Sequence, residues 1–174
     1  MLADWAAVRS PSFSMPSPRR LALFVALIVL VDQWSKSWAV NALDDGRTID
    51  VLWTLRFALG FNSGIAFSQA QDLGPVVGIV ALVAVALLIR AAVRAETVFA
   101  AYGLAMIIGG AIGNLADRVF RGDGWLHGHV VDFIDFQWFA VFNAADSAIT
   151  VGAGVLIFGL FREYREAKRL ERHI

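Results

Sequence analysis

Cysteine is absent from this sequence of 174 residues, and histidine occurs only three times. Without cysteine the chain can form no disulfide, no thiolate metal site and no cysteine nucleophile, and it can carry no lipid on a cysteine of its own. Charge is also scarce, at 17% of residues against about 25% in ordinary soluble domains. Basic and acidic residues balance at 15 each, so there is no net charge to attract nucleic acid.

Apolar and aromatic residues, in contrast, make up 58% of the chain, too many for the water-facing surface of one small domain. Four apolar segments are each long enough, at about 1.5 Å per residue, to cross the ~30 Å hydrocarbon layer of a bilayer. The sequence therefore predicts an all-α membrane protein, a four-transmembrane-helix bundle in one domain over 21–161. We expect a disordered tail over 1–20 and a basic tail over 162–174 that continues the last helix. The four segments are 21–42, 74–93, 97–117 and 141–161.

A cleaved signal peptide is the alternative interpretation of the first segment, because a pair of arginines precedes the apolar run. The residues after that run include Asp32, Trp34 and Lys36, which do not form a small-residue cleavage site. We therefore interpret the first segment as an uncleaved span.

The basic residues predict the orientation of the bundle. Ten of them lie before the first span, between the second and third spans, or after the fourth, whereas four lie in the loops at 43–73 and 118–140. Basic residues are enriched on the cytoplasmic side, so we expect both termini in the cytoplasm and both of these loops outside. The first outer loop contains IDVLWTLRFALGFN, whose aromatic and branched residues predict a small extracytoplasmic β-element at the membrane surface.

Polar residues within the spans gather toward the outer ends of three of them. Asp32 and Lys36 are four residues apart in the first span, in the order that favours a pair on one helical face. The third span ends with Asn114, Asp117 and Arg118, of which Asn114 and Arg118 share a face. Both groups have two interpretations: a structural ion pair, such as Arg118 with Asp117, or a direct chemical role.

Carboxylates also occur in the fourth span and just before it. Asn143 and Asp146 share a face in its first turns, where a carboxylate is costly unless it is solvated or paired. Asp132 and Asp135 lie in the apolar run VVDFIDF of the second outer loop. An acid brought from this run to Asp146 would share one proton with it, the arrangement with which aspartic proteases activate water. The pattern alone does not choose between Asp132 and Asp135.

Other chemistries find little support. No serine lies in a nucleophile-elbow pattern, and there is no HExxH motif and no phosphate-binding glycine loop. His127 and His129 flank Gly128 near Asp123, so a metal site is an alternative there to a solvated glycine-rich turn.

Five blocks occur together in the chain: DQWSK at 32–36, NSGIAF at 62–67, GGAIGNLADR at 109–118, VVDFIDF at 130–136 and FNAADSAI at 142–149. In their residues and their order, these blocks resemble those of signal peptidase II, the bacterial lipoprotein signal peptidase family. The resemblance implies that Asp132 and Asp146 are the catalytic pair. It further implies a set of residues that bind substrate or support the acids: Asn62, Gly64, Asn114, Arg118, Asn143, Asp32, Lys36 and Asp117.

The resemblance also implies the activity. The expected substrate is a prolipoprotein that carries diacylglycerol on its lipobox cysteine, and the expected reaction cuts the peptide bond just before that cysteine. The implied enzyme is a monomer of the bacterial inner membrane, in contact with lipid, with its active site toward the periplasm and with no metal or organic cofactor. A transporter and a membrane scaffold are the alternatives, although the chain has no internal repeat of the transporter kind.

Overall fold

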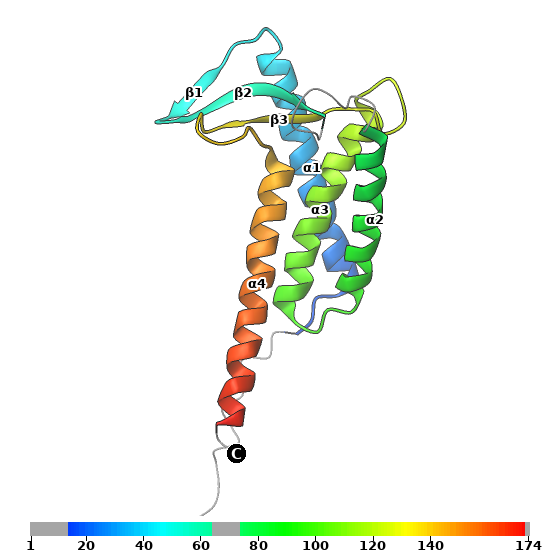
Figure 1. Ribbon diagram of the computed structural model, residues 1–174, viewed down its shortest axis with the longest axis vertical. Helices are drawn as coiled ribbons and strands as arrows, with labels where there is room; N and C mark the ends of the chain where they lie inside the picture. The colour runs from blue at the N-terminus through cyan, green and yellow to red at the C-terminus, as the bar shows by residue number, and fades with distance from the viewer. Residues whose placement is uncertain (1–13, 64–73, 173–174) are drawn as a thin grey trace, which may run out of the picture.

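Four long helices lie side by side in the computed structural model, which describes residues 14–63 and 74–172 (Figure 1). The helices are α1 (Pro18–Leu43), α2 (Gly74–Val93), α3 (Val98–Phe120) and α4 (Ala144–Glu171). All four are long and apolar enough to cross a membrane. The predicted bundle of four membrane-spanning helices is therefore confirmed.

The first helix begins earlier than the sequence predicts. Pro18 occupies its first turn, where the fixed φ and the missing N–H of proline suit a helix start. Ser17 caps the helix by accepting a hydrogen bond from the backbone N–H of Arg20. Residues 18–20 are thus helical rather than part of a disordered tail, while 1–13 lie outside the described residues.

A three-stranded antiparallel sheet lies across one end of the bundle (Figure 1). Its strands are β1 (Ile49–Leu52), β2 (Leu55–Asn62) and β3 (Val130–Asp135), in that spatial order. The predicted β-element of the first outer loop is present as β1 and β2, and the second outer loop adds β3. Sequence patterns miss β3 because nearly all of its residues are buried, so it lacks the alternation that marks a half-exposed strand.

The central helix of the bundle is α3, which packs against α1, α2 and α4, whereas α2 contacts no other described helix or strand. Glycines permit these close contacts. A Cβ on Gly109 would come within 2.9 Å of the Ile28 side chain in α1, and a Cβ on Gly103 within 2.9 Å of the backbone oxygen of Gly152 in α4. Small residues thus set the spacing of three helices.

Aromatic side chains join the sheet to the outer end of α1. Trp38 meets Phe57 of β2 edge to face, with 5.2 Å between ring centroids, and Phe57 lies 6.1 Å from Phe133 of β3. Phe133 is also part of a buried apolar cluster with Leu43 of α1. Because this packing fixes β3 against α1, it also fixes the polar residues that β3 carries.

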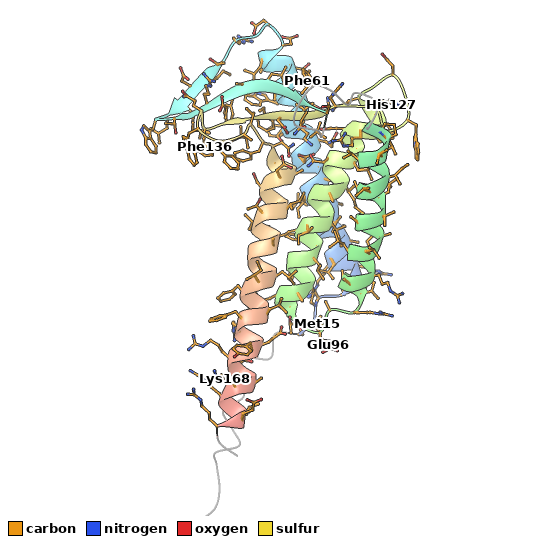
Figure 2. All side chains as sticks on the ribbon, viewed as in Figure 1. Met15, Phe61, Glu96, His127, Phe136 and Lys168 are labelled. Carbon is orange, nitrogen blue, oxygen red and sulfur yellow. The ribbon has the colours of Figure 1, made fainter. Side chains whose placement is uncertain are left out.

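Both described ends of the chain lie at the end of the bundle away from the sheet (Figure 1). There α4 extends beyond the other helices and carries basic side chains, among them Lys168 (Figure 2). Four crossings return the chain to the side on which it started, so the sheet and the two ends lie on opposite sides of the bundle.

Candidate active site

A reciprocal pair of hydrogen bonds between Asn143 and Asp146 begins α4. The side-chain oxygen of Asn143 accepts from the backbone N–H of Asp146 at 2.9 Å, and Oδ2 of Asp146 accepts from the backbone N–H of Asn143 at 3.3 Å. This capping box orients both side chains in the first turn. The partial positive charge of a helix N-terminus also favours a negative charge at this position.

The same asparagine holds Asp132, which lies in β3. Nδ2 of Asn143 donates to Oδ1 of Asp132 at 2.7 Å, and Nδ2 of Asn62 donates to Oδ2 of Asp132 at 3.1 Å. Asp132 is only 4% exposed. Burial raises the pKa of the Asp132 carboxyl, hydrogen bonds from Asn62 and Asn143 oppose the rise, and the charge of Asp146 adds to it. Asn143 therefore contacts both acids, because its side chain donates to the carboxylate of Asp132 and its backbone N–H donates to the carboxylate of Asp146.

Asn114 of α3 extends this chain of amides. Its Nδ2 donates to Oδ1 of Asp146 at 2.8 Å, and its Oδ1 accepts from Nδ2 of Asn143 at 3.1 Å. Neither Asp132 nor Asp146 forms a salt bridge within residues 14–63 and 74–172. Two acids that face neutral donors can share one proton without breaking an ion pair.

Behind these acids lies a second, fully buried group of charges. Nζ of Lys36 is 2.9 Å from Oδ2 of Asp32 and 2.9 Å from Oδ2 of Asp117. Backbone N–H groups at the start of α4 and in β3 donate to Asp32 at 2.9 Å and to Asp117 at 3.1 Å. The ion pair that the spacing of Asp32 and Lys36 predicts is thus present, and its contacts join α1 to α3, α4 and β3.

Two further residues join this group, Gln33 and Arg121, and neither is among the residues predicted from the sequence. Nε2 of Gln33 donates to Asp32 at 3.1 Å and to Asp117 at 3.0 Å, and Nε of Arg121 lies 2.9 Å from Oδ1 of Asp117. Gln33 could have been found, because an amide inside an apolar span needs polar partners. Arg121 could have been found as well, because it lies four residues after Asp117, the spacing that also predicts the pair of Asp32 and Lys36.

Arg118 is buried but is directed toward the end of β2. Its Nη1 donates to the backbone oxygen of Ser63 at 3.2 Å. In the described part of the chain it forms no ion pair with Asp117, so the structural alternative suggested by their adjacency is absent. Gly64, which the resemblance also implies, lies outside the described residues.

Asp135, the other candidate acid of VVDFIDF, has a different environment. Its Oδ2 lies 2.8 Å from Nη2 of Arg56, and its Oδ1 accepts from the backbone N–H of Gln137 at 2.6 Å. The hydrogen bond from Gln137, together with that from Arg56, lowers the pKa of Asp135. The structure thus gives Asp135 a cation and places Asp132, not Asp135, beside Asn143.

An apolar groove of about 370 Å³ begins at Asp146 and lies between α2, α3 and α4. Its lining includes Val77 and Leu88 at the two ends of a stripe on α2, which span about 16 Å of helix. The groove can therefore hold an extended apolar chain whose polar head lies at the acids. The polar residues of its lining are Asn62, Asn114, Arg118 and Asp146, and apolar ones include Ala81, Ala84, Ile107 and Ala111.

The glycine-rich turn after α3 does not form a metal site in the part of the chain that the structure describes. Nδ1 of His127 lies 2.9 Å from the backbone oxygen of Trp125 (Figure 2 labels His127). No cluster of three or more metal-ligating side chains occurs among the described residues.

Comparison with known proteins gives consistent matches. The model of the signal peptidase (SPase) II family matches residues 24–162. The lipoprotein signal peptidase of Brucella ovis is 41% identical over 155 residues, covering 84% of this chain and 93% of that protein. The lipoprotein signal peptidase of Mycobacterium leprae is 39% identical over 148 residues, covering 83% of this chain and 74% of that protein.

Two solved structures, each described as a bacterial membrane enzyme, share the fold. Both are 25% identical to this chain, with TM-scores of 0.66 and 0.63. The first match covers 84% of this chain and 90% of the solved one, and the second covers 82% and 93%. These matches decide between the enzyme, the transporter and the scaffold. The chain belongs to the signal peptidase II family, the lipoprotein signal peptidases, and is an aspartic-type peptidase.

Proposed function

We propose that Asp132 and Asp146 carry out the reaction of this lipoprotein signal peptidase, the removal of signal peptides from prolipoproteins. The observation that supports this proposal is the arrangement around Asn143, which donates from its side chain to the carboxylate of Asp132 and from its backbone to the carboxylate of Asp146, at the polar end of the apolar groove that Asp146 lines. Asp32 and Asp117, two buried acids nearby, face cations instead: Lys36 pairs with both of them, and Arg121 pairs with Asp117.

In the proposed reaction, one carboxylate takes a proton from a water molecule whose oxygen attacks the scissile carbonyl carbon. The protonated partner donates its proton to the carbonyl oxygen. The first acid then passes the proton that it took from water to the leaving nitrogen as the C–N bond breaks, and the hydroxyl formed from the carbonyl oxygen returns its proton to the partner. The raised pKa of Asp132 supports a pair that retains one proton. These steps need no metal or organic cofactor.

The proposed substrate carries diacylglycerol on a cysteine, and the bond that is cut lies just before this cysteine. The groove supports this choice because its apolar stripe on α2 suits an acyl chain, while its polar end suits the peptide. Arg118 and Asn62 lie where their donors could hold peptide or ester carbonyls beside the acids.

We also propose that the protein acts as a monomer in the bacterial inner membrane, with both termini cytoplasmic and the sheet on the periplasmic side. The excess of basic residues at the end opposite the sheet supports this orientation. Exposed aromatic side chains support contact of the sheet with lipid, since Trp53 is 92% and Trp138 71% exposed. One chain supplies both acids and every donor to them that is described above.

The test is cleavage of a diacylglyceryl-modified prolipoprotein by the purified protein, with the products identified by mass. We expect one cut, immediately before the lipidated cysteine, and no cut in the same substrate without its lipid. Equal cleavage of the two substrates, or a cut at another bond, would contradict the proposed specificity.

A second test addresses the groove. Ala84→Phe should lower kcat/KM for the lipidated substrate, because the ring would fill the apolar stripe. Val83→Phe is the matched control, since Val83 is one residue away, 54% exposed and not part of the groove lining. Equal effects of the two variants would place the acyl chain elsewhere.

A further inference from the structure

The buried ammonium of Lys36 connects to Asp146 through a single side chain. Nζ of Lys36 donates to Oδ1 of Asn114 at 2.8 Å, and Nδ2 of Asn114 donates to Oδ1 of Asp146 at 2.8 Å. The three residues come from α1, α3 and α4, so the link crosses the bundle. It runs from the group of charges around Lys36 to the acids at the head of the groove.

The ammonium fixes the direction in which the amide of Asn114 points. An ammonium has only donors, so the amide oxygen must face Lys36 and the NH2 group must face Asp146. The reversed amide would place NH2 against the ammonium and oxygen against the carboxylate, and both contacts would be repulsive. Asn143 reinforces the observed orientation, because its Nδ2 donates to the same oxygen at 3.1 Å.

This orientation has different consequences for the two acids. Asp146 accepts from the NH2 of Asn114 and from a backbone N–H of the capping box, and it lies at the N-terminal end of α4, so three sources of partial positive charge face its carboxylate. Asp132 lies off the helix in β3 and is almost fully buried, which favours its neutral form. The pair is therefore asymmetric before any substrate binds.

We propose that Lys36 is a positioning residue of the active site: through Asn114 it keeps Asp146 as the ionised member that accepts the proton of water, while Asp132 carries the shared proton. This inference rests on the proposed function of the two acids and adds their division of labour. Lys36 touches neither substrate nor water in it and acts only through the orientation of an amide.

Charge alone does not account for the effect of Lys36, because its surroundings are balanced. Two buried carboxylates and two cations meet there, so the positive charge of Lys36 is opposed by the nearby negative charges of Asp32 and Asp117. The charged groups that face the link are Asp32 of α1, Asp117 and Arg118 of α3, Arg121 at the C-cap of α3, and Asp132 of β3. Lys36 therefore acts chiefly by direct contact with Asn114.

The test is the pH dependence of kcat for the lipidated substrate, whose acid limb reports the group that must be ionised. The first variant is Lys36→Met with Asp32→Asn, which removes one cation and one anion and so avoids an unpaired buried charge. The second is Asn114→Leu, which breaks the same link while Lys36 keeps both carboxylates. We expect each to move the acid limb up by about one pH unit, with kcat affected more than KM.

The combined variant distinguishes the link from a general electrostatic effect. If Lys36 acts through Asn114, joining all three substitutions should move the limb no further than either set alone. Additive shifts would overturn the proposal, as would an unmoved limb in a folded Lys36→Met/Asp32→Asn protein. If that protein does not fold, the proposal is tested with Asn114→Leu alone. An acid limb that stays in place in Asn114→Leu would overturn the proposal.

Two controls separate this inference from its premise. Arg121→Gln removes an ion pair of Asp117 without touching Asn114, so it should lower thermal stability and leave the limb in place. A merely structural role for Lys36 would make its variant behave as Arg121→Gln does. Asp132→Asn and Asp146→Asn are assayed alongside, because cleavage by either would refute the proposed function rather than the role of Lys36.

Discussion

Two pairs of aspartates lie at the same end of the bundle, in different electrostatic environments. Asp32 and Asp117 share the ammonium of Lys36, 2.9 Å from each carboxylate. Asp132 and Asp146 receive hydrogen bonds from the side-chain amides of three asparagines and no salt bridge from the described residues. All four residues are aspartates, but the first pair faces a cation and the second pair faces neutral amides.

This difference indicates what each pair can do. A carboxylate that shares a buried cation has to stay ionised, because protonating it would leave the cation uncompensated. An acid that faces neutral amides can gain or lose a proton and keep its neighbours in place. The first pair is therefore suited to holding helices together, and the second is suited to proton transfer.

The largest effect should follow from replacing the second pair. Asp132→Asn and Asp146→Asn should each lower kcat by at least about a hundredfold, because a positioned acid or base contributes that much or more. Both variants should remain folded, since the shape of the side chain barely changes. The measurements are cleavage of lipidated substrate and Tm in detergent.

Asp135→Asn is the matched control for these variants, because Asp135 lies three residues from Asp132 in the same strand but pairs with Arg56. It should cleave at nearly the parent rate. An inactive Asp135→Asn beside an active Asp132→Asn would reverse the assignment of the acids.

Replacing the cation of the first pair should instead affect stability. Lys36→Met leaves two carboxylates buried without their ammonium, and breaking a buried pair in this way costs roughly 3–5 kcal/mol. The free energy of unfolding in detergent is the measurement. Arg47→Gln is the control, because its pair with Asp45 is more than half exposed (59% and 57%) and such pairs contribute about 0–1 kcal/mol. Similar losses of unfolding free energy in Lys36→Met and Arg47→Gln would contradict a special structural role for the buried charges around Lys36.

How much of this could be predicted from the sequence depends on the range of the interactions. The spans and the Asp32–Lys36 pair follow from local patterns of hydropathy and spacing, and the structure has them. The choice of Asp132 over Asp135 came only from the resemblance, because it depends on which residue of β3 faces the bundle. The hydrogen bond of Gln33 to Asp117 and the pairing of β3 with β2 depend on contacts between distant segments, which no local pattern encodes.

Arg118→Lys should lower activity less than replacement of either proposed catalytic acid does. Lysine keeps the charge but loses the planar group that reaches the backbone of Ser63 and lines the groove. We expect kcat/KM to fall about tenfold with little change in Tm, because a misplaced substrate is cut more slowly. Normal kinetics would remove Arg118 from the site, and a large loss of Tm would indicate a structural role.

The pH dependence of activity tests whether Asp132 carries the proton. The pKa of Asp132 is raised, chiefly by burial, so activity that needs its proton should be lost as the pH rises through that pKa. The hydrogen bond from Asn62 opposes the rise, so Asn62→Ala should move this basic limb to higher pH. A limb that moves to lower pH, or not at all, would show that Asp132 does not carry the proton.

The smallest effect should come from Asp135, whose salt bridge lies at the edge of the sheet. Its pKa is lowered by the backbone of Gln137 and by Arg56, so its folded-state pKa lies below its unfolded value. The stability that this shift provides is present above the unfolded pKa and is lost as the pH falls through the folded one. The Tm difference between the parent and Asp135→Asn should therefore be largest near neutral pH and should vanish in acid.

For Asp132 the pH dependence of stability should have the opposite sign, because its raised pKa makes the native state bind more protons than the unfolded state. The Tm of Asp132→Asn should therefore increase relative to that of the parent as the pH rises. Parallel pH profiles for the two variants would mean that the two aspartates of β3 share one environment, and the contrast on which the assignment of roles rests would fail.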